Sequence, residues 1–502
     1  MFVGRKIGAI FSYILMTVEV VSSLLFTPFL IRVLGQAEFG VYSLSLSITS
    51  YFTLLDLGVG NAMVRYLAKY RAEGDLKSQE KFLGLAFLFY LAVCVVMAAL
   101  FIPFEQSFAT MFGNGLSTEE IGLAQSLLRV TIINAGITMI VSIFDKVLIA
   151  YELFALSKTI QIAKLVVRVA MQFALLALGF RSMGIVVSNL VLTIIAGAVT
   201  FAIVAGKLRL IPTFKGLDLS FVKEIIAYTS FVFLQMIATQ INSMAGQVIL
   251  GMTTSAVILG IYAVGTQIHQ YFQSIASGIN GVTMPGIVAL WGAGAPKQEI
   301  ELEMIKVGRL SLLVIGIIMG GFLAVGDSFV SLWAGQENAD AYGVAVLLML
   351  PMTLALAQSA GSQVLWAMGR HQLQAVIKLL ASIGNILMTF ALVSWNPLIG
   401  AALSSSLSCF IGDIVAMNAV FKREIKINLV NYYKGLLKGI APSVMVASVS
   451  AWLLKYLLPF GWASLVVEIV VALIVYALCL YQFGFNEYEK SLVGSIMERA
   501  FK

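Results

Sequence analysis

The stretch that decides the fold runs from Phe26 to Arg71 and reads FTPFLIRVLGQAEFGVYSLSLSITSYFTLLDLGVGNAMVRYLAKYR. It has two long apolar runs joined by the short segment LGQAEFG, and it ends in a basic sequence. Because a membrane-spanning helix needs about 20 mostly apolar residues, the stretch predicts the end of one such helix, a turn and a second helix. Asp56 lies inside the second run, where a charged group is costly and is usually retained for function.

The composition of the whole chain extends this pattern. Of its 502 residues, 60% are hydrophobic and 11% are charged, against about 25% charged residues in an average soluble domain. The chain therefore has room for about 14 spans and for no sizeable soluble domain. We place the spans at about residues 8–33, 39–62, 82–104, 122–145, 157–178, 183–206, 222–249, 255–284, 305–327, 341–366, 372–394, 397–421, 435–457 and 461–483.

The basic residues alternate between the two sets of connecting segments. One set, to which Lys146 belongs, carries nearly all Lys and Arg residues, whereas the other has only Arg32, Arg129, Arg181 and Lys455. Positively charged loops stay on the cytoplasmic side, so the alternation predicts that both termini are cytoplasmic. The net charge of +7 then reflects topology, and no nucleic-acid partner is expected.

An internal repeat is seen when the chain is shifted along itself. FGVYSLSLSITSYFTLLDLG falls on LGIYAVGTQIHQYFQSIASG, with Gly40 on Gly260, and a second alignment places Lys164 on Lys378. The matching spans are six helices apart, which predicts a parallel repeat of two six-helix lobes. We therefore predict an all-α polytopic membrane protein with a central cavity: an N-terminal lobe at 1–206, a cytoplasmic linker at 207–221, a C-terminal lobe at 222–421, appended helices at 435–483 and a cytoplasmic tail at 484–502.

Charged residues within the predicted spans indicate what could pass between the lobes. Lys164 and Arg168 are four residues apart and share one helix face, and Lys378 is at the matching place in the other lobe. Such a cationic patch suits a phosphate group, and Glu19 and Asp56 would balance its charge. The alternative is that both lysines extend to the headgroups, while Glu19 and Arg168 form a structural ion pair.

Spans 7 and 8 are rich in amides, which both donate and accept hydrogen bonds as sugar hydroxyls require. The candidate sugar contacts are Gln235, Gln240, Asn242, Gln247, Gln267, Gln270 and Gln273. The alternative for each is a hydrogen bond that joins two helices. His269 is either a hydrogen-bonded packing residue or, with Glu19 or Asp56, a group that couples transport to protons or sodium ions.

The sequence gives no indication of an enzyme. It has no phosphate-binding Walker loop, no nucleophile with a nearby base and no metal-ligand spacing, so no cofactor is expected beyond a coupling proton or sodium ion. Without a nucleotide site, an ion gradient or the gradient of the substrate would drive transport. We interpret Gly58 and Gly60 as positions where helices approach each other closely.

The segment from Thr27 to Tyr70 resembles the polysaccharide-transporter branch of the multidrug/oligosaccharidyl-lipid/polysaccharide exporter superfamily, the Wzx-type O-antigen and repeat-unit flippases. The resemblance lies in the proline late in the first span, in LGQAEFGVY, and in LDLGV followed by a basic exit. It extends over the chain in length, span number, two-lobed repeat and the extra helix pair.

This resemblance implies a flippase in the bacterial cytoplasmic (inner) membrane. It would move an undecaprenyl-pyrophosphate-linked oligosaccharide repeat unit to the outer leaflet by alternating access, for O-antigen, capsule or exopolysaccharide synthesis. Lys164, Arg168 and Lys378 would hold the pyrophosphate, and a polysaccharide polymerase and a chain-length regulator would be partners beside the membrane lipids. The alternatives are a multidrug or cation extruder, a lipid II flippase of the same superfamily, and a non-transporting scaffold for polysaccharide assembly enzymes.

Overall fold

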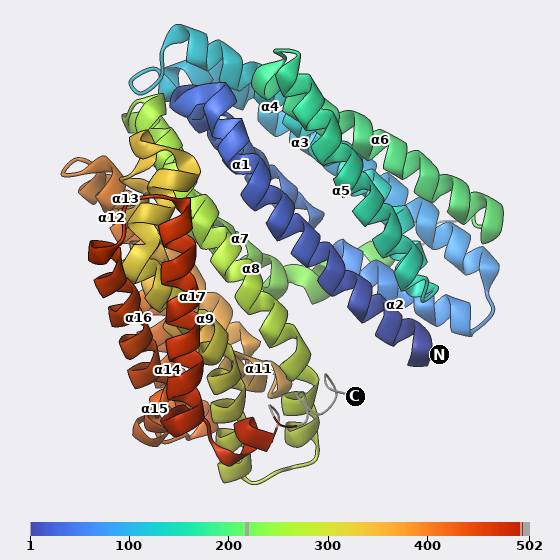
Figure 1. Ribbon diagram of the computed structural model, residues 1–502. Coiled ribbons are helices and arrows are strands. Elements are labelled where there is room, and N and C mark those ends of the chain that lie inside the picture. The colour runs from blue at the N-terminus through green and yellow to red at the C-terminus, as the bar shows by residue number, and fades with distance from the viewer. Residues whose placement is uncertain (1, 216–219, 492–493, 495–502) are drawn as a thin grey trace. The chain divides into compact units, whose positions relative to one another are not determined.

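A computed structural model of the chain describes residues 2–215, 220–491 and 494, and within these ranges the regular structure is helical (Figure 1). The first eight α-helices are α1 (Phe2–Phe52), α2 (Val59–Ala72), α3 (Leu76–Phe112), α4 (Thr118–Ala150), α5 (Phe154–Ala177), α6 (Arg181–Lys207), α7 (Ser220–Thr253) and α8 (Ala256–Gly292). They are followed by α9 (Lys297–Ala334), α10 (Ala341–Ala357), α11 (Ser359–Ala367), α12 (His371–Val393), α13 (Pro397–Cys409), α14 (Met417–Val420), α15 (Leu429–Leu437), α16 (Ile440–Leu457) and α17 (Trp462–Cys479).

The helices have the length and composition of a multi-pass membrane protein. Ten segments of the described chain are long and apolar enough to cross a membrane, or eleven if the bent pair α10–α11 is one span. The first of them contains Gly35, whose φ of 75° interrupts the helix in the predicted LGQAEFG turn. The all-α membrane fold is confirmed, while the number of 14 spans stays a prediction.

The LDLG sequence breaks the predicted second span, which is a correction to the expected helix at 39–62. The α-helix ends at Phe52, a 3-10 turn covers Thr53–Asp56, and Leu57 and Gly58 have φ values of 52° and 72° before α2 begins. Gly58 has open space around it, so its role is the left-handed turn. The interpretation of Gly58 as a close helix contact was wrong.

Two further predicted spans are divided. α10 and α11 are bent by 47° at Gln358, so the span at 341–366 is not one straight helix. The span predicted at 435–457 begins instead at Ile440, because Gly439, with a φ of 76°, separates α15 from α16. The span at 397–421 contains a π-helical segment, Phe410–Ala416.

The chain forms two compact units. The first comprises Met1–Ala263 and Thr389–Pro397, and the second comprises Val264–Met388 and Leu398–Lys502. In the first, α4 packs against α1, α3 and α6, and in the second α9 packs against α10, α15, α16 and α17. The predicted lobe limits, linker and tail stay predictions.

Within the first unit, α1 and the beginning of α8 touch at two glycines. A Cβ on Gly40 would meet the carbonyl oxygen of Ala256 and lie 2.7 Å from the backbone nitrogen of Gly260, and a Cβ on Gly260 would meet the carbonyl oxygen of Gln36. Backbones approach this closely only where no side chain intervenes. These two glycines are the pair that the sequence repeat aligns.

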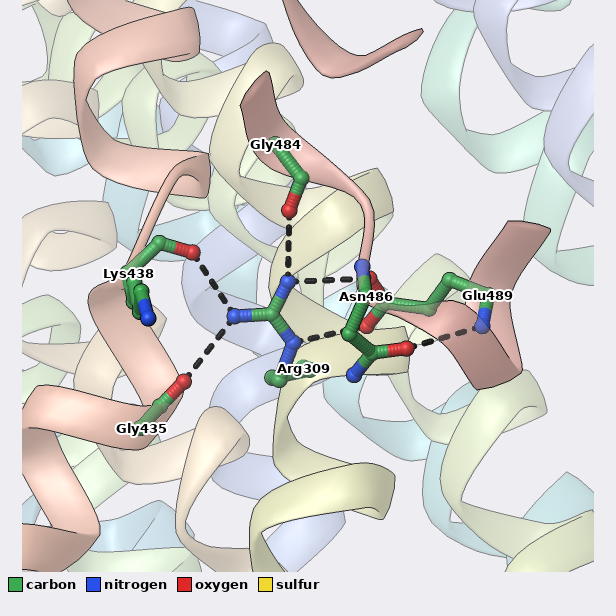
Figure 2. Close-up of polar contacts among 6 residues, drawn as sticks. All are labelled: Arg309, Gly435, Lys438, Gly484, Asn486 and Glu489. Carbon is green, nitrogen blue, oxygen red and sulfur yellow. Dashed lines mark hydrogen bonds and ion pairs between the residues drawn. The ribbon is translucent and has the colours of Figure 1, made fainter. Parts of the chain in front are cut away.

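A buried arginine ties three segments of the second unit together (Figure 2). Arg309 on α9 donates from Nε and Nη2 to the Glu489 carboxylate at 2.7 and 2.9 Å. It also donates to the carbonyl oxygens of Gly435, Lys438 and Gly484 at 2.9, 2.7 and 2.8 Å. All five N–H groups of the guanidinium are thereby used. This network fixes the turn between α15 and α16 and the segment after α17 on α9.

Candidate functional site

The first unit contains a cavity of about 510 Å³ whose wall includes several polar side chains. Residues of the α1–α2 region, α4, α6 and α7 line it. Its polar side chains are those of Thr49, Thr53, Asp56, Thr131, Asn134, Thr138, Ser142, Lys146 and Asn189. Among the residues that the structure describes, the wall thus has one carboxylate and one ammonium group beside hydroxyls and amides.

Helix α4 supplies five of these side chains from one face. Thr131, Asn134, Thr138, Ser142 and Lys146 follow one another at intervals of three or four residues, which places them on a single stripe along the helix. A capping box fixes the start of α4, because the Ser117 hydroxyl accepts from the Glu120 N–H at 3.3 Å while the Glu120 carboxylate accepts from the Ser117 N–H at 2.8 Å. The polar stripe therefore belongs to a regular, capped helix.

The broken second span brings Asp56 into the cavity wall. The Tyr90 hydroxyl of α3 donates to Asp56 Oδ1 at 2.5 Å. One turn above the break, the hydroxyls of Thr49 and Thr131 are 2.7 Å apart and join α1 to α4. The Tyr90 contact thus holds the Asp56 side chain in the cavity wall through a neutral donor.

Lys146 supplies the ammonium group of the described cavity wall, and the end of its side chain packs against Gly60. A Cβ at Gly60 would lie 2.9 Å from Lys146 Cε and 3.6 Å from Nζ, so the absence of a side chain there makes room for the lysine. Lys146 is half-buried and has no hydrogen bond or ion pair with any residue that the structure describes. Asn134 Oδ1 is also buried without a hydrogen-bond partner in the described part of the chain. Both groups can bind a ligand without giving up an existing partner.

Lys164 lies directly behind this wall. Its ammonium group donates to Thr193 Oγ1 at 3.0 Å, and Thr193 donates to the carbonyl oxygen of the cavity residue Asn189 at 2.8 Å. Arg168, one turn further along α5, is half-buried and has no ion pair among the described residues, and Glu19 is exposed. The structural ion pair considered for Glu19 and Arg168 is therefore not formed.

Lys378, the third candidate for the pyrophosphate, lies on α12 in the second unit. Its ammonium group is 3.5 Å from Asp413 Oδ1, and both side chains are partly buried. Asp413 belongs to the π-helical segment, and its carbonyl oxygen accepts from the side chain of Gln358 at the α10–α11 bend. Lys378 is thus charge-compensated, which the sequence comparison of the two lobes did not reveal.

The amides predicted to contact sugar are divided between the two units. Gln240 donates to the Ser50 hydroxyl, and the buried Gln247 donates to the Leu259 carbonyl oxygen at 3.4 Å, so these two join helices. Gln270 is exposed, and the buried Nδ1 atom of His269 has no hydrogen-bond partner in the described part of the chain. Gln235 and Asn242 belong to the first unit, and Gln267 and Gln273 to the second.

Sequence reasoning missed Lys146, Asn134 and Tyr90. Lys146 was assigned to a cytoplasmic connection, but it lies within α4 in the cavity wall. The three-to-four residue spacing of polar groups along α4 was the available signal. No comparable pattern marks Tyr90, because only the break at LDLG turns Asp56 toward it.

The chemistry of this wall suits a polar ligand that carries a negative group. Hydroxyl and amide groups bind sugar hydroxyls through donors and acceptors alike, and the unpaired ammonium of Lys146 attracts phosphate or carboxylate oxygens. No group of three metal-ligating side chains converges in the part of the chain that the structure describes. The hydroxyls, the amides and Lys146 together make the cavity a candidate binding site for such a ligand.

Comparisons with solved structures identify the fold. The lipid II flippase MurJ, in its inward closed conformation, superimposes with a TM-score of 0.68 at 15% identity, over 94% of this chain and 97% of the flippase chain. A multidrug resistance MATE family transporter of the MOP superfamily, in its inward-facing conformation, gives a TM-score of 0.64 at 14% identity, over 80% of this chain and 96% of the transporter chain. The predicted fold of this superfamily is confirmed.

Comparisons of sequence point to the same group of proteins. The uncharacterized membrane protein EpsK of Bacillus subtilis (strain 168) is 22% identical over 494 residues, which cover 93% of each chain. The two solved structures are those of a flippase and a transporter, which agrees with the prediction that this chain is not an enzyme. A family model described as polysaccharide biosynthesis protein matches residues 8–291, more than half of the sequence. The chain is therefore a multi-pass membrane protein of the polysaccharide biosynthesis protein family, with the fold of the MOP-superfamily transporters.

Proposed function

We propose that this protein flips an undecaprenyl-pyrophosphate-linked oligosaccharide repeat unit from the cytoplasmic to the outer leaflet of the bacterial inner membrane. The observation that carries the proposal is the polar cavity of the first unit, with the unpaired ammonium of Lys146 among hydroxyls and amides. A family of polysaccharide biosynthesis proteins and a fold shared with a lipid II flippase support a lipid-linked sugar as cargo.

Different side chains of the site would bind different parts of the cargo. Lys146 would attract an anionic group of the cargo, and Asn134 and the hydroxyls of α1 and α4 would bind sugar. Lys164 and Arg168 remain candidates for the pyrophosphate, because neither has a carboxylate partner among the described residues. Lys378 would contribute only after Asp413 releases it.

Transport would follow alternating access with both termini in the cytoplasm and the prenyl tail in lipid throughout. Asp56, Glu19 and His269 are the candidates for binding a coupling proton or sodium ion. Asp56 is the strongest of the three, because it lies in the cavity wall and its Tyr90 contact would respond to protonation. A polymerase and a chain-length regulator would receive the flipped repeat unit.

The test is a flipping assay with the purified protein in vesicles that contain a fluorescent undecaprenyl-pyrophosphate-linked oligosaccharide, read by leaflet-selective quenching. A hydrogen bond to a charged group contributes about 1.5–3 kcal/mol, so Lys146→Gln should slow flipping about 10- to 150-fold. Lys69→Gln is the matched control, because the Lys69 side chain is 61% exposed and forms only a long ion pair of 4.0 Å with Glu73. Wild-type protein that does not flip the substrate, or a Lys146→Gln variant as fast as the control, would refute the proposal.

A lipid II flippase is the second candidate, favoured by the TM-score of 0.68 over 94% of the chain. The same vesicles loaded with fluorescent lipid II separate the two, since faster flipping of lipid II would select this candidate. Drug sensitivity of a deletion strain tests the multidrug alternative. Protection from cationic drugs by the wild-type gene, without any effect on surface polysaccharide, would favour an extruder.

A further inference from the structure

The second unit has an apolar groove on a short helix that the proposed function does not use. The space, about 870 Å³, lies along α15 and the first residues of α16. Leu429, Val430, Tyr433, Leu437 and Pro442 form its apolar wall, and Lys434 and Lys438 lie at its edge. Val430 is 62% exposed and Leu437 is 36% exposed, so the wall is open to the surroundings of the protein.

Helix α15 is apolar on two sides. Asn428 caps it by accepting from the N–H groups of Val430 and Asn431 at 3.1 and 3.3 Å. Tyr432 and Leu436 are fully buried and attach the helix to the second unit. No residue that the structure describes covers the face of Val430 and Leu437 in this way. A short helix with an exposed apolar face and lysines is typical of the membrane interface.

The backbone beneath the groove is held in place. Arg309 donates to the carbonyl oxygens of Gly435 and Lys438, at the end of α15 and at the turn that follows (Figure 2). Gly439 completes the turn with a φ of 76°, and a Cβ there would lie 2.6 Å from Gly484 Cα. Because these contacts hold the groove open before any ligand arrives, little ordering is required on binding.

The edge of the groove carries uncompensated positive charge. Lys434 and Lys438 are exposed and one helical turn apart, and neither forms an ion pair with a residue that the structure describes. The nearby carboxylates have other partners: Glu489 binds Arg309, Glu424 is close to Arg370 and Arg423, and Glu301 accepts from the N–H of Asn428. Like charges one turn apart repel each other, and a phosphate between the two ammonium groups would relieve that repulsion.

We propose that this groove binds an anionic membrane phospholipid. An acyl chain lies along Val430, Leu437 and Pro442, and the phosphate bridges Lys434 and Lys438. Basic pockets between membrane helices commonly bind acidic lipid headgroups. The described residues of the wall offer no side-chain amide or carboxylate for sugar hydroxyls, and the Tyr433 hydroxyl is already engaged with Gln358 and Asn418 at 2.6 and 2.7 Å. A resident phospholipid therefore fits the lining better than the lipid-linked oligosaccharide does.

Native mass spectrometry of the full-length protein tests the proposal. The protein is exchanged into detergent with equal amounts of phosphatidylglycerol and phosphatidylcholine that have identical chains. We expect at least tenfold more bound phosphatidylglycerol than phosphatidylcholine. The Lys434→Gln/Lys438→Gln variant should lose at least tenfold of the bound phosphatidylglycerol, and Val430→Asp should lose both lipids. Equal binding of the two lipids by wild-type protein would overturn the proposal.

Lys422→Gln/Lys426→Gln is the matched control, because both lysines are exposed in the segment before α15 but do not line the groove. It should retain phosphatidylglycerol within twofold of wild type, and unaltered thermal unfolding of both double variants would show that the fold is intact. Equal losses in the two double variants would contradict a specific site. Undecaprenyl phosphate and additional phosphatidylglycerol are then compared as competitors for the bound phosphatidylglycerol. If undecaprenyl phosphate displaces it at the lower concentration, the groove belongs to the cargo lipid instead.

Discussion

Breaking the Arg309–Glu489 pair by removing one partner should be among the most destabilising single changes in the second unit. The two side chains are 5% and 3% exposed, and each N–H of the guanidinium has an acceptor (Figure 2). Removing one member of a buried ion pair costs about 3–5 kcal/mol, because the other charge is left without a partner. We therefore expect a loss of this size for Glu489→Ala.

Arg309→Ala should cost more than Glu489→Ala. It leaves the carboxylate of Glu489 unpaired and also removes the donor from the carbonyl oxygens of Gly435, Lys438 and Gly484. Each unsatisfied buried carbonyl adds about 1–3 kcal/mol. Arg309→Lys keeps the charge but has three N–H donors in place of five, so its loss should be intermediate.

Thermal unfolding of the purified protein in detergent, followed by tryptophan fluorescence, measures these losses. For a unit of about 230 residues, 1 kcal/mol corresponds to about 2–4 °C in Tm, so Glu489→Ala should lower the Tm by at least about 6 °C. The control is Glu303→Ala, which removes the partner of Lys306 on the same helix. That pair is 3.1 Å long with side chains 34% and 27% exposed, and it should contribute less than about 1 kcal/mol.

Limited proteolysis adds a local readout, because Glu489 holds the segment after α17 to α9. Trypsin should cut after Lys490 faster in Glu489→Ala than in wild type, and no faster in Glu303→Ala. A Glu489→Ala protein with the same Tm and the same cleavage rate as Glu303→Ala would refute the reasoning.

Two further predictions concern the first unit. Gly40→Ala should reduce the yield of folded protein, since its Cβ would meet backbone atoms of Ala256 and Gly260. The control is Gly122→Ala on α4, where nothing lies within 4 Å; this change should be neutral or stabilise the protein by up to about 1 kcal/mol. Size-exclusion profiles compare the yields of the two variants, and equal yields would contradict the close contact. The Ser78 hydroxyl and N–H donate to Asp75 at 2.6 and 3.0 Å and hold the pKa of this carboxyl below its usual value. The ionised Asp75 should therefore stabilise the first turn of α3 at every pH above the usual carboxyl pKa. That stabilisation should be lost as the pH falls through the lower pKa of the folded state. Hydrogen exchange in residues 76–80, corrected for intrinsic rates, should show that pH dependence in wild type but not in Asp75→Ala, and identical profiles would contradict it.

Some residues of the candidate site could be predicted from the sequence pattern alone. Asp56 was recognised because a carboxylate is conspicuous in an apolar run, and Lys164 and Arg168 because they are four residues apart on one predicted helix. Lys146 was not recognised, since a lysine near the end of a span also satisfies the charge rule for cytoplasmic loops. Lys378 was paired with Lys164 by alignment, but its Asp413 partner comes from a π-helical segment that helix periodicity does not predict.

The sequence by itself determined the membrane class, the helical fold and the approximate limits of most spans, because apolar length and loop charge are local properties that the bilayer imposes on each segment separately. Tertiary structure decided which polar groups meet. The left-handed residues Leu57 and Gly58 turn Asp56 toward Tyr90, and the missing side chain of Gly60 gives Lys146 its place in the cavity. Arg309 likewise finds its acceptors on two segments that are more than 120 residues away in the chain. Such contacts depend on how helices pack, and packing is set by the whole set of neighbouring side chains rather than by any one stretch of sequence.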